Sequence, residues 1–224
     1  MEINENLDLQ SYEKIIKAAH NYGEKTMFCD TMKKLWKRGV QVVIKRVNTP
    51  EKYPTAYVFV KGDKGPNKRD GWFHYFTFVM LKGKEGSSIL TSDREGTIKI
   101  FKSHAISRFI SRHGWNGDRE SCENYIMLHT LVACLDIDPY TNEINEYFAD
   151  GMFLGCVKDG IQYINTYIDD SIMHRNQKIK EKWLKLRLNE AKITEAQRGD
   201  AVLGQIVKKI DSLTNEDQWK HIRK

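Results

Sequence analysis

Hydrophobic positions change their period several times along the chain, and each change marks a different type of element. In the first 39 residues, apolar side chains recur at helical spacing. Residues 11–23 and 24–39 each predict an amphipathic helix that ends at a glycine, and Ser11 is the expected N-cap of the first. Together they predict an N-terminal helical cap over residues 1–39.

From Val40 the period becomes two, which is typical of β-strands. Runs of β-branched and aromatic residues alternate there with turn-forming clusters, and the short links suit antiparallel hairpins. The predicted strands are VQVVIKRV, TAYVFVKG, GWFHYFTFVMLKG, SSILT and GTIKIF. This part of the chain therefore predicts a meandering sheet.

The helical period returns in two segments, residues 102–114 and 118–135, which are separated by a glycine-containing turn. Asp118 or Ser121 can cap the second helix. The acidic residues 136–146 lack the glycine and the ligand spacing of a calcium-binding EF-hand, so we expect a solvated loop.

The last third of the chain predicts another hairpin and two helices. Residues 146–170 alternate between apolar and polar positions, and Asp159-Gly160 suits the turn of this hairpin. Residues 176–213 predict two helices, the last of which begins at a capping box over residues 194–197. The expected fold is α+β: a curved antiparallel sheet of about five to seven strands, a helix pair inserted before the last hairpin, and helices at both chain ends.

Composition changes this picture little. With 224 residues, 40% hydrophobic and 29% charged, the chain suits one compact, soluble domain made of the cap, a core over residues 40–173 and a helical extension over residues 174–224. No stretch approaches the ~18 apolar residues of a membrane span, and the N-terminus does not resemble a secretory signal. We expect a cytoplasmic protein with no membrane partner. The cysteines are expected to be reduced core residues: Cys29, Cys122, Cys134 and Cys156.

Charge is distributed unevenly along the chain. Residues 1–117 carry a net charge of +9, residues 118–173 carry −9, and residues 174–192 carry +5. The split has two interpretations, complementary parts of one molecule or a basic surface for an anionic partner. Bases in the first sheet lie among aromatic residues, which suits nucleic-acid binding and equally suits edge strands that avoid pairing. These bases are Lys45, Lys61, Lys64, Lys68, Arg69, Lys82, Lys84 and Lys99.

The strongest candidate chemistry lies in the segment KSHAISRFISRHGW, residues 102–115. At about 100° per residue, His104, Arg108 and Arg112 form one polar stripe opposite an apolar helix face. With Ser103 as the expected N-cap, His104 lies in the first turn, where the helix dipole favours a neutral ring able to accept a proton. Arginine suits phosphate oxygens. The spacing is also that of an ordinary solvated face, and both interpretations stay open.

A helix with His and Arg that packs on an antiparallel sheet, followed by a strand with hydroxyl residues (INTYI, residues 164–168), resembles the barnase-like and toxin-type small ribonucleases over about residues 71–170. The resemblance implies RNA cleavage that needs no metal ion and no cofactor. The site it implies contains His104 as base or acid, Arg108 and Arg112 as phosphate ligands, and Thr166, Tyr167, Tyr163 and Asn165 as substrate-binding candidates.

Other histidines and the C-terminal helix favour packing roles. His74 shares a strand face with apolar residues and is expected to be hydrogen-bonded and partly buried, whereas His113 is expected to be packed or to cap the helix. Over residues 176–191 two apolar stripes imply two packing partners, one of which can be a second copy of the chain. The stripes are Ile179, Trp183 and Leu186, and Leu184, Leu188 and Ala191. The alternative to an RNA-directed protein is therefore a non-enzymatic interaction or assembly protein, such as one of a phage or mobile element.

Overall fold

The computed structural model describes residues 7–26, 42–50, 53–64, 71–93, 95–115, 117–148, 151–198 and 201–215. Most of the predicted helix over residues 24–39 lies outside the described residues, and so does Cys29. The helices are α1 (Leu9–Thr26), α3 (Ser103–His113), α4 (Arg119–Thr130), α5 (Arg175–Arg198) and α6 (Ala201–Asn215). The strands are β1 (Val42–Asn48), β2 (Pro54–Lys64), β3 (Gly71–Gly83), β4 (Gly86–Ser92), β5 (Ile98–Phe101), β6 (Leu135–Ile137), β7 (Glu143–Phe148), β8 (Gly151–Lys158) and β9 (Ile161–Asp169).

One sheet connects all nine of these strands in the order β1-β2-β3-β4-β5-β9-β8-β7-β6. Its neighbours are antiparallel except β5 and β9, which are parallel. A parallel pair needs a long crossover, and α3, α4 and the strands β6 to β8 form it. The predicted α+β fold, with helices near both ends, is confirmed. The sheet, expected to be antiparallel with about five to seven strands, is mixed but mostly antiparallel and has nine strands among the described residues.

The two strands that the sequence pattern missed are β6 and β7, which occupy most of the expected acidic loop over residues 136–146. The Asp138 carboxylate accepts hydrogen bonds from the backbone N–H groups of Tyr140 and Thr141 and closes a tight turn between them. The acidic segment is thus a hairpin, and its carboxylates are distributed along strands instead of around a common centre.

Several helix ends also differ from expectation. Asp8 caps α1, because its carboxylate accepts from the backbone N–H of Ser11. Helix α3 begins at Ser103, with Lys102 at the N-cap position, so His104 remains in the first turn. The expected capping box at residues 194–197 lies inside the continuous helix α5. Asp118 caps α4 as predicted.

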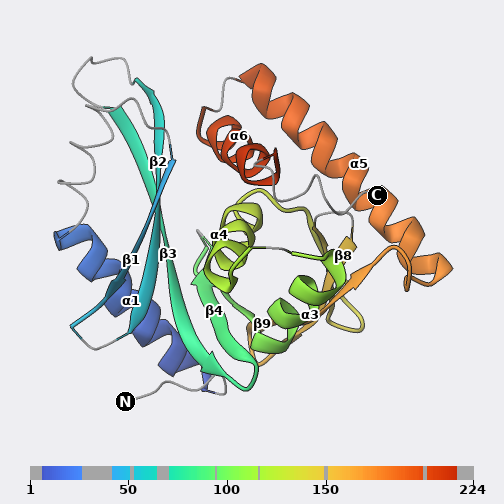
Figure 1. Cartoon of the computed structure of the whole chain (residues 1–224), viewed down its shortest axis with the longest axis horizontal. Coiled ribbons are helices and arrows are strands. Elements are labelled where there is room, and N and C mark those ends of the chain that lie inside the picture. The colour runs from blue at the N-terminus through green and yellow to red at the C-terminus, as the bar shows by residue number, and fades with distance from the viewer. Residues whose placement is uncertain are drawn as a thin grey trace.

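Helices cover both faces of the sheet (Figure 1). Helix α1 packs on the side of β3, β4 and β5 that carries Val79, Leu90 and Ile100, whereas α3, α4 and α6 pack on the other side. Gly23 lies inside α1 instead of ending it. A glycine is needed there because a Cβ would collide with the ring of Tyr57.

The second side of the sheet is strongly concave. Strands β5 and β7 are three positions apart in the sheet order, which corresponds to about 14 Å in a flat sheet. The Lys99 Nζ on β5 nevertheless lies 2.9 Å from the Glu146 Oε2 on β7. These side chains meet because the sheet curls around the space between them.

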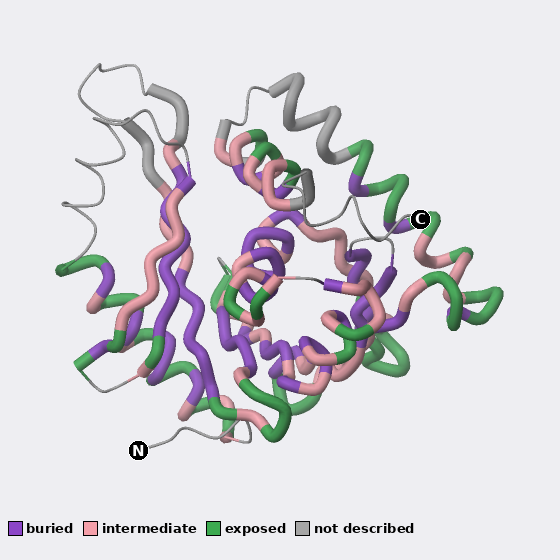
Figure 2. Tube along the Cα trace, in the orientation of Figure 1, coloured by how far each residue is buried: buried purple, intermediate pink, exposed green. Residues whose placement is uncertain are grey.

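Aromatic rings fill the main core inside this curl, and buried stretches of several helices and strands lie around it in Figure 2. The Phe109 ring on α3 lies at the centre: its centroid is 5.3 Å from that of Phe148 and 5.1 Å from that of Tyr167, both in edge-to-face geometry. His113 stacks on the same ring at 4.9 Å, which confirms that it belongs to the packing.

The sheet opens between β3 and β4. Strand β4 pairs with β3 only from Phe78 to Gly83, while the first half of β3 pairs with β2 alone. The β4–β5 hairpin ends at the pair Ser92 and Ile98. A gap in the hydrogen bonding of the sheet therefore lies between the first half of β3 and the β4–β5 turn.

In the parts of the chain that the structure describes, no helix is both long and apolar enough to cross a bilayer.

Replacement of Phe109 by alanine tests the aromatic core. Because the ring is fully buried, Phe109→Ala should lower the free energy of unfolding by about 3–5 kcal/mol. Denaturant unfolding followed by circular dichroism measures this value. Tyr140→Ala is the control, since Tyr140 is 94% exposed, and it should change stability by less than about 0.5 kcal/mol. A similar small change for Phe109→Ala would contradict the described core.

Candidate functional site

The candidate site combines a histidine of α3 with a carboxylate from the turn between β3 and β4. The Nδ1 of His104 lies 2.8 Å from the Oε1 of Glu85. On the other side of the ring, the Nε of Arg108 donates to the Nε2 of His104 at 3.3 Å. These contacts fit a neutral imidazole whose Nδ1–H donates to the carboxylate and whose Nε2 lone pair accepts.

Two backbone contacts hold Glu85 against α3. The Ser107 hydroxyl donates to the backbone carbonyl of Glu85 at 3.2 Å, and the backbone N–H of Glu85 donates to the Ser103 hydroxyl at 3.3 Å. These contacts hold the β3–β4 turn against α3, so the Glu85 carboxylate stays beside the imidazole. The Glu85 and His104 side chains are 46% and 44% exposed, so a ligand in solution can reach both.

The hydrogen bond from His104 also sets the electrostatics of the pair. It is the main reason that the pKa of the Glu85 carboxyl is lowered, with smaller contributions from a Ser107 hydrogen bond and the charge of Arg108. Glu85 is therefore a carboxylate over the physiological pH range and can orient the imidazole.

Arg112 does not join this group. Its Nη1 donates to the backbone carbonyl of Tyr167 on β9, and its charge helps to lower the pKa of the Asp169 carboxyl, although a Ser171 hydrogen bond contributes most to that shift. Of the predicted stripe, the structure brings together His104 and Arg108 and places the Arg112 guanidinium at the end of β9.

The β9 residues expected to bind substrate are not gathered beside His104. Tyr167 is fully buried against Phe109, and Tyr163 lies on the opposite face of the sheet, with the Lys102 Nζ 5.0 Å from its ring centroid. The Asn165 Nδ2 donates to the Cys156 Sγ at 3.6 Å.

An irregularity in the β8–β9 pairing accounts for this arrangement. Leu154 is opposite Thr166, but the next residue, Gly155, is opposite Ile164, so Asn165 is an extra residue in the ladder. Beyond it the alternation of faces is reset, and Tyr167 points into the same core as Ile164. Thr166 is half-buried on the other side.

A buried carboxylate behind the site ties three elements together. The Glu123 side chain is 5% exposed, and its Oε2 accepts from the Arg46 Nη1 at 2.9 Å. Its Oε1 accepts from the Ser87 hydroxyl and from the Arg119 Nε, the latter at 3.3 Å. The carboxylate thus links β1, α4 and the start of β4.

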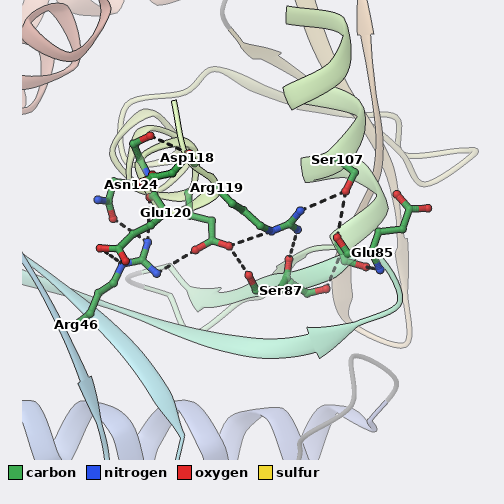
Figure 3. Close-up of polar contacts among 12 residues, drawn as sticks. Arg46, Glu85, Ser87, Ser107, Asp118, Arg119, Glu120 and Asn124 are labelled. Atoms are coloured by element: carbon green, nitrogen blue, oxygen red, sulfur yellow. Dashed lines mark hydrogen bonds and ion pairs between the residues drawn. The ribbon is translucent and has the colours of Figure 1, made fainter. Parts of the chain in front are cut away.

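Arg119 carries this network to the candidate site. Its Nη2 donates to the Ser87 carbonyl at 2.8 Å and its Nη1 donates to the Ser107 hydroxyl at 3.3 Å, as Figure 3 shows. Since Ser107 in turn donates to the Glu85 carbonyl, one chain of polar contacts runs from Glu123 to the residue that pairs with His104.

The ion pairs also explain much of the charge split along the sequence. Among the residues that the structure describes, those that join a basic segment to the acidic segment, residues 118–173, are Arg46–Glu120, Arg46–Glu123, Lys99–Glu146, Lys178–Asp170 and Lys180–Asp136. This favours complementarity within the molecule as the main reason for the split. Arg108, which is exposed and has the His104 ring as its hydrogen-bonding partner, can turn to an anionic ligand.

Glu123 offers a direct test of the network. Glu123→Ala removes the buried acceptor and leaves Arg46 and Arg119 facing each other, so the free energy of unfolding should fall by about 3 kcal/mol. Glu120→Ala, on the same helix and beside the same Arg46, is the control, because Glu120 is 64% exposed and its loss should cost less than about 1 kcal/mol. Equal effects of the two substitutions in urea unfolding would contradict the network.

The Glu85–His104 pair predicts a pH dependence. Because the folded-state pKa of Glu85 lies below its unfolded value near 4.3, the pair stabilises the fold above that value, and this contribution is lost as pH falls through the folded pKa. A carbon-detected NMR titration should show a Glu85 pKa below the ordinary glutamate range in the wild type and a higher one in His104→Ala. Identical titration of Glu85 in both proteins would show that the pair does not form.

The chain was compared with known protein families, curated proteins and solved structures. No model of a known protein family, no curated protein and no solved structure matches the chain. The inference of function therefore rests on the placement of the side chains described above.

Proposed function

We propose that the protein cleaves RNA and that the Glu85–His104–Arg108 group performs the reaction. The observation that supports this most is the arrangement around one imidazole, with a carboxylate on Nδ1 and a guanidinium on Nε2. A base that is itself oriented by a carboxylate, beside an always-charged arginine, is what activation of a hydroxyl next to a phosphate requires.

The proposed reaction uses the ribose 2′-hydroxyl as the nucleophile. When RNA binds, Arg108 turns from the imidazole to a non-bridging phosphate oxygen and leaves the Nε2 lone pair unoccupied. Nε2 takes the 2′-hydroxyl proton, O2′ bonds to phosphorus, and the bond from phosphorus to O5′ breaks. O5′ takes a proton from solvent, which gives a 2′,3′-cyclic phosphate and a 5′-hydroxyl end. Glu85 stabilises the imidazolium that forms.

Arg112 has a secondary role in this proposal. It follows Arg108 by one helical turn, about 6 Å along α3, which is similar to the phosphate spacing of an extended strand. Because its contact to the Tyr167 carbonyl uses Nη1, other N–H groups of the guanidinium can bind the next phosphate. The proposal does not use Tyr167, whose side chain is buried.

Cleavage of single-stranded RNA tests the function. The purified protein should cleave a fluorescently labelled RNA in buffer with EDTA, and His104→Ala should lower the rate by about 10²–10⁴-fold, the range typical of a lost general base. Glu85→Gln should lower it by a smaller factor because the imidazole remains. His174→Ala is the control, since His174 is exposed and precedes α5. A wild-type protein without activity, or a His104→Ala protein with full activity, would contradict the proposal.

A second candidate function is self-association through α5. As the two predicted stripes require, Leu184 and Leu188 are buried against the domain, whereas Ile179, Trp183 and Leu186 are 43–61% exposed. Charge repulsion between two copies is reduced, because ion pairs with Asp170 and Asp136 neutralise two lysines of this helix. The exposed stripe thus offers an apolar strip on a helix whose other side already packs.

Sedimentation velocity tests this second candidate. The wild type should form dimers at micromolar concentration, and Trp183→Glu should remain monomeric, because a charge in the apolar strip disfavours its burial. Tyr140→Glu, an equally large change at an exposed position outside α5, should leave the dimer intact. A monomeric wild type would rule this candidate out and would leave the proposed RNA cleavage unaffected.

A further inference from the structure

A row of polar side chains crosses three neighbouring strands on the concave side of the sheet. Thr91 on β4 is directly opposite Lys99 on β5, and Lys99 is directly opposite Gln162 on β9. Residues in register on adjacent strands point to the same face, so these three side chains lie side by side. Flanking positions on the same face, Ile89 and Phe101, belong to the apolar core. Polar groups at this depth need hydrogen-bonding partners, so the partner of each of the three side chains is informative.

All three side chains line a cavity of about 850 Å³. The cavity lies where the sheet opens between β3 and the β4–β5 turn, so its walls come from both halves of the sheet, from α1 and from α6. Its volume lies in the range of sites that hold drug-sized ligands. The apolar part of the wall includes Phe76, Leu131, Leu135, Val202 and Ile206, and the aromatic part includes Tyr75, which stacks on His20 at 4.6 Å.

Lys99 brings little net charge into the cavity. Its Nζ is 2.9 Å from the Oε2 of Glu146, which is fully buried, and the Oε1 of the same carboxylate accepts from the Thr130 hydroxyl at 3.1 Å. The ammonium and the carboxylate neutralise each other, while an ammonium has three N–H groups and this contact uses one. The wall therefore offers hydrogen-bond donors without a strong attraction for an anion.

Gln162 is the residue that points most clearly to a ligand. It is 8% exposed and lines the cavity, yet its side-chain amide has no hydrogen-bond partner among the residues that the structure describes. Although the residue is largely buried, its amide atoms are not among those shielded from solvent without a partner, so they are accessible from the cavity and offer two donors and one acceptor to whatever enters it. Thr91, which donates its hydroxyl to the Thr77 carbonyl, can still accept a hydrogen bond beside it.

We propose that this cavity binds a nucleobase with its ribose, either as a free nucleoside or as an unpaired base of an RNA strand. A primary amide flanked by a hydroxyl and an ammonium matches the mixed donors and acceptors along the edge of a base. Aromatic and apolar walls suit the faces of a planar ring. The neutral Lys99–Glu146 pair favours an uncharged heterocycle over a phosphate. The cavity does not include Glu85, His104 or Arg108, so this inference does not depend on the proposed cleavage.

Isothermal titration calorimetry with defined probes tests this inference. Adenosine, guanosine, cytidine and uridine are each titrated into the full chain, and a single-stranded decamer of mixed sequence with 2′-O-methyl groups, which the proposed reaction cannot cleave, is titrated separately. At least one nucleoside, or the decamer, should bind, and Gln162→Leu should weaken that binding by at least tenfold because the amide contacts are lost. Gln10→Leu, a matched change at an exposed position of α1 outside the cavity, should leave binding unchanged.

A second variant and a separate readout keep the outcomes distinct. Ala133→Trp, which adds volume at the cavity wall, should abolish binding even if Gln162→Leu alters stability. Binding of nucleosides supports a free ligand, whereas binding of the decamer alone supports an RNA base as the occupant. No binding by any probe, or binding that both variants leave unchanged, would overturn the proposal. Nucleoside binding is measured without any cleavable bond, so loss of base binding in Gln162→Leu and loss of cleavage in His104→Ala are separate readouts.

Discussion

The buried carboxylate of Glu123 is the interaction on which the candidate site depends. It accepts from Arg46 on β1, from Arg119 on its own helix and from Ser87 at the start of β4. Burial of a carboxylate is unfavourable unless its oxygens are paired, and here two guanidinium groups and a hydroxyl pair them. The resulting contacts hold the β3–β4 turn against α3, and the turn carries Glu85 to His104. The position of the Glu85–His104 pair at the surface thus depends on the buried hydrogen bonds of Glu123.

Local sequence patterns predict the helices and strands that are determined by residues close together in the sequence. Strands β1 to β5 follow from a period of two between turn clusters, and α3 follows from an apolar stripe of helical period. Strands β6 and β7 were missed because acidic residues dominate that segment, and one of them, Glu146, is buried only because Lys99 reaches it across the curled sheet. A pairing over 47 residues of sequence leaves no local signal.

The same distinction applies to the two candidate sites. His104 was identified from its place in the first helical turn, but Glu85 lies in a short turn, KGKEG, whose composition suggests only a hairpin. Lys99 was grouped with the basic surface of the first sheet, whereas the register with Thr91 and Gln162 places it in a cavity. Tyr167 shows the opposite effect, because an extra residue in β9 directs a predicted substrate contact into the core. The Glu85 contact comes from a turn that packs against a helix, and the differences at Lys99 and Tyr167 come from strand register; both depend on tertiary structure.

The two proposals together describe a protein that acts on RNA through one surface group and one cavity, and the proposal for the surface group is the central claim. The chemical identity of the RNA ends tests it most directly. Mass spectrometry of the products should find 2′,3′-cyclic phosphate and 5′-hydroxyl ends from an RNA oligonucleotide, and an oligonucleotide of the same sequence with 2′-O-methyl groups should stay intact, because no 2′-hydroxyl remains for His104 to deprotonate. Cleavage of the methylated oligonucleotide, or products with 5′-phosphate ends, would contradict the account.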